Sequence, residues 1–327
     1  VYNSSNPKIM AREESVKQTE LKIGIVGMGA IGSSLAALFT GNGYAATVLG
    51  RRAESVFMAA YDAVYDSIEA RKLITKEQRQ ACRRLVSYTV DYADLKDADI
   101  VFECVPEILE EKHKIYAQLE ASCEKLQALA SATSALSPDD LIKGVHKWPE
   151  KVLVAHPFNP PHLVPFVEIV KSAITAQKPV DLVYNFLESC GRRVCIMKKS
   201  APGFIANRLH HALLREAMYM VDNGLADPEE IDKTLMYSFM PRYTSVGIFE
   251  HHDAYGMDML EKLQNYLYPH LAAGTGSPDM VVNKVKAGTL GMKTNKGIYE
   301  WNPAAIADFK KRAADPYWRF FNWNLPS

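Results

Sequence analysis

Residues 21–39 read Leu21-Lys-Ile-Gly-Ile-Val-Gly27-Met-Gly29-Ala-Ile-Gly32-Ser-Ser-Leu-Ala-Ala-Leu-Phe39, which is a short apolar strand, a glycine-rich turn and the start of a helix. In a dinucleotide site, Gly27 would make the tight turn, Gly29 would let the backbone approach the pyrophosphate, and Gly32 would let helix and strand pack closely. The N–H groups at the start of the helix would face the phosphates. The cofactor-binding residues predicted here are Gly27, Gly29, Ala30, Ile31 and Gly32.

The end of the next predicted strand concerns the ribose of the dinucleotide. It reads Val48-Leu49-Gly50-Arg51-Arg52. An acidic residue at the position of Gly50 would hydrogen-bond the ribose diol, whereas a small residue followed by arginine suits a 2′-phosphate, because guanidinium offers paired donors. We therefore predict that Arg51 and Arg52 bind NADP in preference to NAD. The alternative is that both arginines are solvent-exposed and NAD binds without the acidic contact.

From Leu21 onward, β-rich runs alternate with helical patterns, which predicts a parallel sheet of Rossmann type. A long helical stretch, 54–86, predicts a two-helix arm that turns near residues 73–75, because Thr75 with Glu77 and Gln78 is typical of a helix start. Seven strands are predicted: Lys22–Val26, Ala46–Leu49, Ile100–Cys104, Leu126–Ala130, Val152–Ala155, Val164–Val170 and Arg193–Met197.

The pattern changes after Pro202-Gly203, beyond which helical periodicity prevails to Trp301. We expect an N-terminal arm at 1–20, a dinucleotide-binding α/β domain at 21–200 and a mainly α-helical domain at 201–327. The helical domain carries more apolar positions than a unit of its size can bury, so we predict a homodimer through it.

Composition excludes several classes of protein. The 327 residues are 48% hydrophobic and 23% charged, with 38 basic and 38 acidic side chains. This balance offers no basic surface for nucleic acid. The apolar runs have strand length and fall short of the ~20 residues that span a bilayer. The polar start, residues 1–20, has no apolar core of a signal peptide, so we expect a cytoplasmic protein with a small-molecule substrate.

His156 stands out among the nine histidines by its position. It follows a predicted strand directly and precedes Pro157-Phe-Asn-Pro-Pro161, so its imidazole is expected at the sheet edge where ligands of α/β proteins bind. Glu168 lies in an otherwise apolar strand, where a buried carboxylate needs a partner. Glu168 could orient the ring while the other nitrogen takes a hydroxyl proton. The alternative is a core histidine beside an unrelated buried glutamate.

With these motifs the chain resembles the L-3-hydroxyacyl-CoA dehydrogenase family, which includes lambda-crystallin (L-gulonate 3-dehydrogenase) and carnitine dehydrogenase. The resemblance extends from about Leu21 to Trp301. Besides the glycine turn and the His156 run, it rests on three motifs: Glu103-Cys-Val-Pro-Glu107, Ser131-Ala-Thr-Ser134 and Pro202-Gly-Phe-Ile-Ala-Asn207-Arg. It implies hydride transfer between a nicotinamide and the C3 hydroxyl of a substrate.

Residue by residue, the resemblance implies that His156 is the base and Glu168 its orienting acid. Ser134 and Asn207 would hydrogen-bond the substrate; the alternatives are a turn serine and a helix-capping or inter-domain asparagine. Glu107 and Lys112 match positions near the nicotinamide ribose. The resemblance also implies a dimer.

The substrate stays open between two classes. Ala132-Thr133-Ser134 departs from the Asn-Thr-Ser usual in acyl-CoA enzymes, and Arg242 could anchor the carboxylate of a small free hydroxy acid, the alternative being a surface or inter-subunit salt bridge. In the other direction, residues 282–301 resemble the acyl-CoA branch, and Lys72 beside Arg71 could meet CoA phosphates or be a solvated charge pair. We favour a short-chain 3-hydroxyacyl-CoA such as 3-hydroxybutyryl-CoA, in fatty acid metabolism, over an L-gulonate- or carnitine-type acid.

The sequence disfavours two further hypotheses, a metal site and a non-catalytic binding protein, of which the latter stays the second alternative to a dehydrogenase. Metal binding by His251-His252-Asp253 or His210-His211 is disfavoured because adjacent helical side chains point about 100° apart. A non-catalytic, crystallin-like binding protein would not need His156, Glu168 and Asn207, and all three are present.

Overall fold

The computed structural model of the protein describes residues 21–326, so the predicted arm at 1–20 lies outside the described residues. The chain divides into two compact units between Ile205 and Ala206. Residues 21–205 and 314–326 form the first unit, called here the Rossmann unit, and Ala206–Ala313 belong to the second, called the helical unit. This α/β unit followed by a helical unit confirms the predicted fold class.

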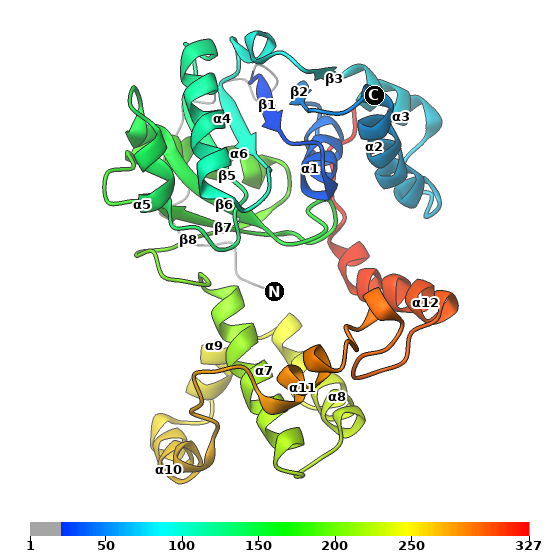
Figure 1. The fold of residues 1–327 in the computed structure, drawn as a ribbon, viewed down its shortest axis with the longest axis vertical. Helices are drawn as coiled ribbons and strands as arrows, with labels where there is room; N and C mark the ends of the chain where they lie inside the picture. Colours follow the sequence, from blue (N-terminus) through cyan, green and yellow to red (C-terminus); the bar gives the residue numbers. More distant parts are fainter. Residues whose placement is uncertain (1–20, 327) are drawn as a thin grey trace. The chain divides into compact units, whose positions relative to one another are not determined.

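The Rossmann unit is built on one eight-stranded sheet with the order β3-β2-β1-β4-β5-β6-β7-β8 (Figure 1). The first six positions have the strand order of a doubly wound dinucleotide-binding fold. All seven predicted strands are present within a few residues of their expected ends. The bounds are β1 Ile23–Val26, β2 Ala46–Leu49, β3 Val86–Thr89, β4 Ile100–Glu103, β5 Ala128–Ser131, β6 Val152–Pro157, β7 Phe166–Lys171 and β8 Arg193–Ile196.

The sheet differs from the prediction in two respects. The sequence analysis missed β3 by assigning its first residue to the helical arm, whereas Val86 pairs with Ala46 of β2. An edge strand of four residues carries too little local pattern to be distinguished from a helix end. The predicted parallel sheet also contains one antiparallel pair, because β7 runs antiparallel to β6. Only residues 158–165 join these strands, which is shorter than a parallel crossover requires.

Helices cover both faces of the sheet (Figure 1). One core contains side chains of α1, α2 and α6, among them Phe39 and Phe186, whose rings lie 4.8 Å apart. The other core contains side chains of α4 and α5, such as Tyr116 and Leu141. Because both faces are covered, ligands can reach the sheet only at its edges. These helices are α1 Ala30–Thr40, α2 Glu54–Glu69, α4 Leu109–Ser122, α5 Pro138–Leu141 and α6 Gln177–Ser189.

The predicted two-helix arm is confirmed as α2 followed by α3 (Lys76–Arg84). Thr75 begins α3 with a capping box: its hydroxyl accepts from the N–H of Gln78, and the Gln78 side chain accepts from the N–H of Thr75. The arm packs on α1 through Tyr61 and Tyr65, whose hydroxyl oxygens lie 2.8 and 3.0 Å from that of the buried Thr40. Tertiary contacts thus hold the arm against α1 within the Rossmann unit.

The C-terminal end corrects the predicted domain at 201–327, because residues 314–326 pack on the Rossmann unit. Trp323 is 7% exposed and belongs to the same core as α1 and α2. Its ring fits against Gly41, where an added Cβ would come within 2.2 Å of it. Arg71 forms an ion pair of 2.5 Å with Asp315 and lies 4.4 Å from the Trp318 ring centre. Burial of these aromatic rings is the physical reason for the return of the chain.

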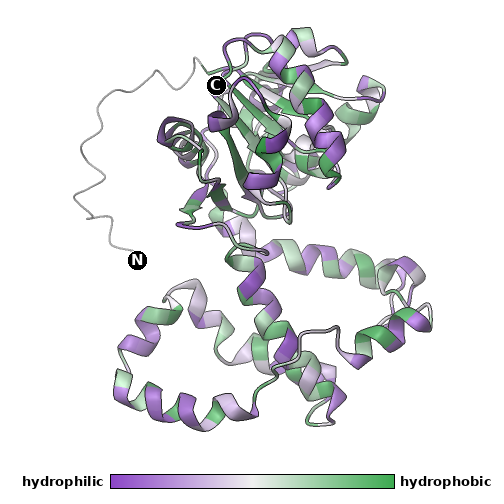
Figure 2. Cartoon of the chain, turned by 60° about the vertical axis from the view of Figure 1, so that its left-hand side comes forward, coloured by the Kyte–Doolittle hydropathy of each residue, from purple (hydrophilic) through white to green (hydrophobic). Residues whose placement is uncertain are grey.

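The helical unit, taken by itself, buries few of its side chains. Ile231 of α8 is a buried apolar residue there, at 8% exposed, whereas Phe249 is 88% exposed and Tyr237 79% exposed. Apolar residues recur along these helices (Figure 2). None of the helices within residues 21–326 combines the length and the apolarity that a membrane span requires. The helices are α7 Ala206–Asp222, α8 Pro228–Tyr237, α9 Ile248–Asp253, α10 Met257–Leu267, α11 Asp279–Lys286 and α12 Pro303–Ala314.

Candidate active site

A cleft of about 800 Å³ opens at the carboxyl edge of the Rossmann sheet, where β1 and β4 lie side by side. In doubly wound folds this is the point where the strand order reverses and where dinucleotides bind. Four of the five residues predicted in the glycine turn line the cleft: Gly27, Gly29, Ala30 and Ile31. The fifth, Gly32, packs beneath it, because an added Cβ would lie 1.9 Å from the carbonyl oxygen of Gly27.

The start of α1 suits a phosphate ligand. Its N-cap is Gly29, and no side chain of the described chain caps it. The first N–H groups of a helix need acceptors, and a side-chain cap would normally supply one. A pyrophosphate at this end would accept from these groups and would meet the positive end of the helix dipole. The glycine turn therefore fits a dinucleotide.

The ribose corner of the cleft has no room for an acidic side chain. A Cβ on Gly50 would lie 2.6 Å from the Met28 sulfur and 2.6 Å from the Tyr88 hydroxyl. Tyr88 comes from β3, the strand that the sequence analysis missed. Arg51 and Arg52 are exposed and line the cleft, with an Arg51 nitrogen 3.4 Å from a carboxylate oxygen of Glu111.

His156 and Glu168 lie directly opposite each other on β6 and β7. His156 Nδ1 is 3.0 Å from Glu168 Oε2, and both side chains are buried, at 8% and 0% exposed. Glu168 Oε1 accepts from the N–H of Ile205 at 2.9 Å. The rings of Phe158 and Phe204 lie 5.0 and 5.5 Å from the imidazole. The antiparallel pairing therefore brings together the two residues that the sequence analysis selected.

This geometry suits a general base. The carboxylate engages Nδ1 and so holds the ring orientation, which leaves Nε2 to exchange a proton with a substrate hydroxyl. A buried carboxylate also stabilises the imidazolium that forms when the proton is taken. His156 is the last residue but one of β6. The carboxyl end of this strand lies at the same sheet edge as the glycine turn, because β6 runs parallel to β5 and, through β4, to β1.

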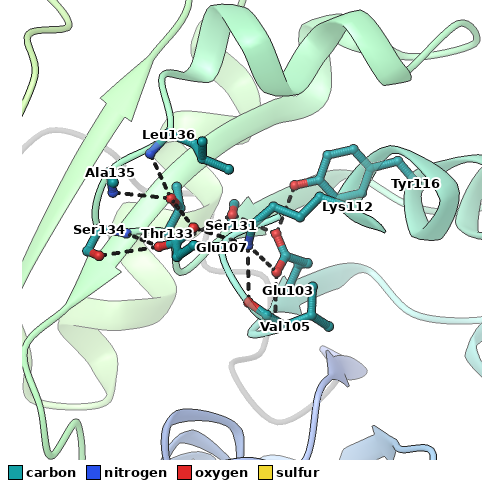
Figure 3. Close-up of polar contacts among 10 residues, drawn as sticks. All are labelled: Glu103, Val105, Glu107, Lys112, Tyr116, Ser131, Thr133, Ser134, Ala135 and Leu136. Atoms are coloured by element: carbon teal, nitrogen blue, oxygen red, sulfur yellow. Dashed lines mark hydrogen bonds and ion pairs between the residues drawn. The ribbon is translucent and has the colours of Figure 1, made fainter. Parts of the chain in front are cut away.

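Ser134 follows β5 at this edge and is held by Glu107 (Figure 3). Glu107 accepts from the Ser134 N–H at 2.7 Å, from the Ser134 hydroxyl at 3.3 Å and from the Thr133 hydroxyl at 2.7 Å. Partial burial would raise the pKa of Glu107, but these hydrogen bonds and the charge of Lys112 lower it below its ordinary value. Glu107 therefore stays ionised and fixes the loop that carries Ser134.

Lys112, predicted near the nicotinamide ribose, is a buried side chain. Its side chain is 1% exposed, and its ammonium donates at 2.7 Å to Glu103, which is fully buried (Figure 3). The sequence analysis missed Glu103 as a member of the site. It ends the apolar strand Ile100-Val-Phe-Glu103, so the argument used for Glu168, that a buried carboxylate needs partners, applied to it as well.

The other predicted residues belong to other elements of the chain. Asn207 is in the first turn of α7 in the helical unit. Arg242, in the same unit, donates to His251 Nε2 at 2.9 Å. Arg242 is exposed and His251 is half-buried. Lys72 is exposed after the end of α2, and its exposed neighbour Arg71 forms an ion pair with Asp315. Among residues 21–326, no cluster of three or more His, Cys, Asp or Glu is placed to hold a metal ion.

Two family models match the chain in succession. Residues 22–200 match "3-hydroxyacyl-CoA dehydrogenase, NAD binding domain" and residues 203–301 match "3-hydroxyacyl-CoA dehydrogenase, C-terminal domain". Together they cover nearly the whole of the described chain.

Similar proteins act on different substrates. L-carnitine dehydrogenase of Oceanobacillus iheyensis is 33% identical over 70% of this chain and 74% of its own. 3-Hydroxybutyryl-CoA dehydrogenase of Clostridioides difficile is 28% identical over 86% of this chain and 100% of its own. Among solved structures, an NAD+-dependent 5-formyl-3-hydroxy-2-methylpyridine 4-carboxylic acid 5-dehydrogenase aligns with a TM-score of 0.81 and 25% identity, covering 90% of this chain and 96% of that one.

Proposed function

From the premise that the chain belongs to the 3-hydroxyacyl-CoA dehydrogenase family, we propose that it oxidises the C3 hydroxyl of a short-chain 3-hydroxyacyl-CoA, with 3-hydroxybutyryl-CoA as the test substrate. The observation that carries this proposal is the buried His156–Glu168 pair at the sheet edge that also bears the glycine turn. A nicotinamide bound there would accept the hydride from C3.

The residues of the chain supply orientation and proton transfer in this proposal. His156 Nε2 takes the proton of the C3 hydroxyl, and Glu168 stabilises the resulting positive charge on the ring. In the reverse direction the imidazolium returns the proton to the developing alkoxide. Ser134 and Asn207 are proposed to hydrogen-bond the substrate and so to fix its C3 against the base. Glu107 would hold Ser134 for this role.

A small free 3-hydroxy acid is the second candidate substrate. One observation favours it: Arg71, a possible partner of CoA phosphates, is already paired with Asp315 and stacked on Trp318. A relative at 33% identity is named L-carnitine dehydrogenase, and carnitine is a free 3-hydroxy acid. In this reading Arg242 would pair with the substrate carboxylate.

One panel of assays tests the function and separates the two substrates. Purified protein is mixed with reduced NADP or NAD and either acetoacetyl-CoA or a free 3-keto acid, and the loss of nicotinamide absorbance is followed. Oxidation with acetoacetyl-CoA alone supports the first candidate, and oxidation with the free acid alone supports the second. If no combination turns over while the dinucleotide still binds, the chain is a binding protein with the family fold.

For the cofactor, we propose NADP in preference to NAD. Gly50 leaves no space for an acid that would repel a 2′-phosphate, and Arg51 and Arg52 line the cleft beside it. Replacing both arginines by alanine should raise the KM for NADP about tenfold, because two charge-assisted contacts are lost, and should change the KM for NAD less than about twofold. Arg84→Ala, at an exposed position of α3, is the matched control. A lower wild-type KM for NAD than for NADP would contradict the proposal.

For the assembly, we propose a homodimer formed through the helical unit. Its exposed large apolar side chains, such as Phe249 and Tyr266, exceed what a monomer surface usually presents. Sedimentation velocity at micromolar concentration should give the mass of two chains, about 73 kDa from 36.5 kDa each. Phe249→Asp should shift the distribution toward the monomer if this side chain lies in the interface. A wild-type monomer under the same conditions would contradict the proposal.

A further inference from the structure

Glu103, a fully buried carboxylate next to the cleft residue Cys104, accepts four hydrogen bonds (Figure 3). Its Oε1 accepts from Lys112 Nζ at 2.7 Å and from the N–H of Val105 at 2.8 Å. Its Oε2 accepts from the hydroxyls of Tyr116 at 2.9 Å and Ser131 at 2.7 Å. These four donors come from α4, from the end of β5 and from the loop after β4, so one side chain joins three segments.

The Glu103–Lys112 pair holds both polar backbone groups of Val105. The N–H of Val105 donates to Glu103, and its carbonyl accepts from Lys112 Nζ at 3.3 Å. Val105 lines the dinucleotide cleft together with its neighbours Cys104 and Pro106. No helix or strand supplies these two hydrogen bonds, since β4 ends at Glu103 and α4 begins at Leu109. The ion pair therefore determines the course of this part of the cleft wall.

The same pair reaches the loop that carries Ser134. Lys112 Nζ lies 3.7 Å from Glu107 Oε2, and Glu107 accepts two hydrogen bonds from Ser134. Ser131, three residues before Ser134, donates directly to Glu103. Both loops that follow β4 and β5 are thus tied to one buried carboxylate.

We propose that Glu103 is a positioning residue, which holds the Val105 loop and the Ser134 loop in the arrangement that binds dinucleotide and substrate. A buried ion pair contributes little net stability compared with an apolar pair of the same volume, because both charges lose their hydration. The partners of this pair are instead polar groups of the cleft wall, which an apolar pair could not hold. The role of Ser134 in this inference rests on the proposed function, whereas the role of Val105 rests on the cleft alone.

Glu103→Gln tests the inference with little change of volume. An amide has one acceptor oxygen, and its NH₂ group would face two of the four present donors, so the loops lose part of their support. We expect the Kd for reduced dinucleotide, measured by its fluorescence without substrate, to rise about tenfold. We also expect kcat/KM to fall further than dinucleotide binding alone explains, because Ser134 is displaced as well.

Glu120→Gln is the matched control. Glu120 lies on α4, the helix of Lys112, is 8% exposed and accepts a backbone hydrogen bond from His146 at 2.8 Å, away from the cleft. A purely structural role of Glu103 predicts that both variants lower the thermal midpoint and leave the Kd of the folded protein unchanged. That outcome would overturn the inference.

Two milder variants cover the case in which Glu103→Gln does not fold. Ser131→Ala and Tyr116→Phe each remove one donor and keep the ion pair, and each should raise the dinucleotide Kd about threefold, as for the loss of one hydrogen bond. Wild-type Kd values in both would overturn the inference. Failure of the wild-type protein to turn over any substrate would remove the proposed function, yet the fluorescence titrations would still decide the role of Glu103 in dinucleotide binding.

Discussion

His156→Gln is expected to lower kcat by about 10²- to 10⁴-fold, which is the contribution of a positioned general base. Glutamine keeps a polar side chain of similar reach near the rings of Phe158 and Phe204, but it cannot accept a proton near neutral pH. The measurement is steady-state turnover with whichever substrate the assay panel identifies, together with a fluorescence titration of the dinucleotide. The Kd of the dinucleotide should stay within about twofold of the wild-type value, because His156 is not part of the glycine turn.

His113→Gln provides the control for this experiment. His113 lies on α4, and its ring nitrogen contacts the carbonyl oxygen of Asp140 at 2.9 Å, outside the site described here. Its kcat should stay close to that of the wild type. If His156→Gln retained more than about a tenth of the wild-type kcat, the base would have to be another group, and the proposed mechanism would be wrong.

Trp323→Ala is expected to lower the free energy of unfolding by about 3–5 kcal/mol, the usual cost of removing a large buried aromatic side chain. The ring is 7% exposed and packs against Gly41 and, at 6.1 Å between ring centres, against Tyr65. Its loss would leave a cavity between the returning chain end and α1. Urea denaturation followed by circular dichroism measures the change.

Two variants make this measurement specific. The indole nitrogen of Trp323 is buried without a hydrogen-bond acceptor among residues 21–326, so Trp323→Phe should cost less than about 1 kcal/mol, because it keeps most of the ring and removes an unsatisfied donor. Phe320→Ala, in the same segment but 39% exposed, should likewise cost less than about 1 kcal/mol. Equal losses in Phe320→Ala and Trp323→Ala would show that the packing of the chain end on α1 is not what stabilises it.

Local patterns were sufficient for a large part of the fold. The spacing of the glycines in the strand–turn–helix of residues 21–39 allows close packing, because the Cα of Gly32 lies against the carbonyl of Gly27, where a Cβ would not fit. The capping box at Thr75 identifies the start of α3 through contacts within four residues. Such features depend on neighbours in the chain and can therefore be predicted from it.

The missed elements depend on distant partners. β3 is a strand because Ala46 and its neighbours offer an unpaired edge, and nothing within residues 86–89 requires it. The C-terminal residues 314–326 pack on the Rossmann unit because α1, α2 and α6 together form an apolar surface for Trp323. Neither surface exists until segments remote in the sequence have assembled.

By itself, the sequence determined the α/β and helical units, the glycine turn and the choice of His156, next to a strand end, and Glu168, inside an apolar strand, as chemically unusual residues. Only the tertiary structure decided that these two residues face each other, since this depends on the antiparallel direction of β7. It also decided that Lys112 forms a buried ion pair with Glu103 and that Arg71 forms an ion pair with Asp315. The physical reason is that a charged residue within an apolar segment predicts a need for a polar partner. The identity of that partner follows from the pairing of strands and the packing of helices.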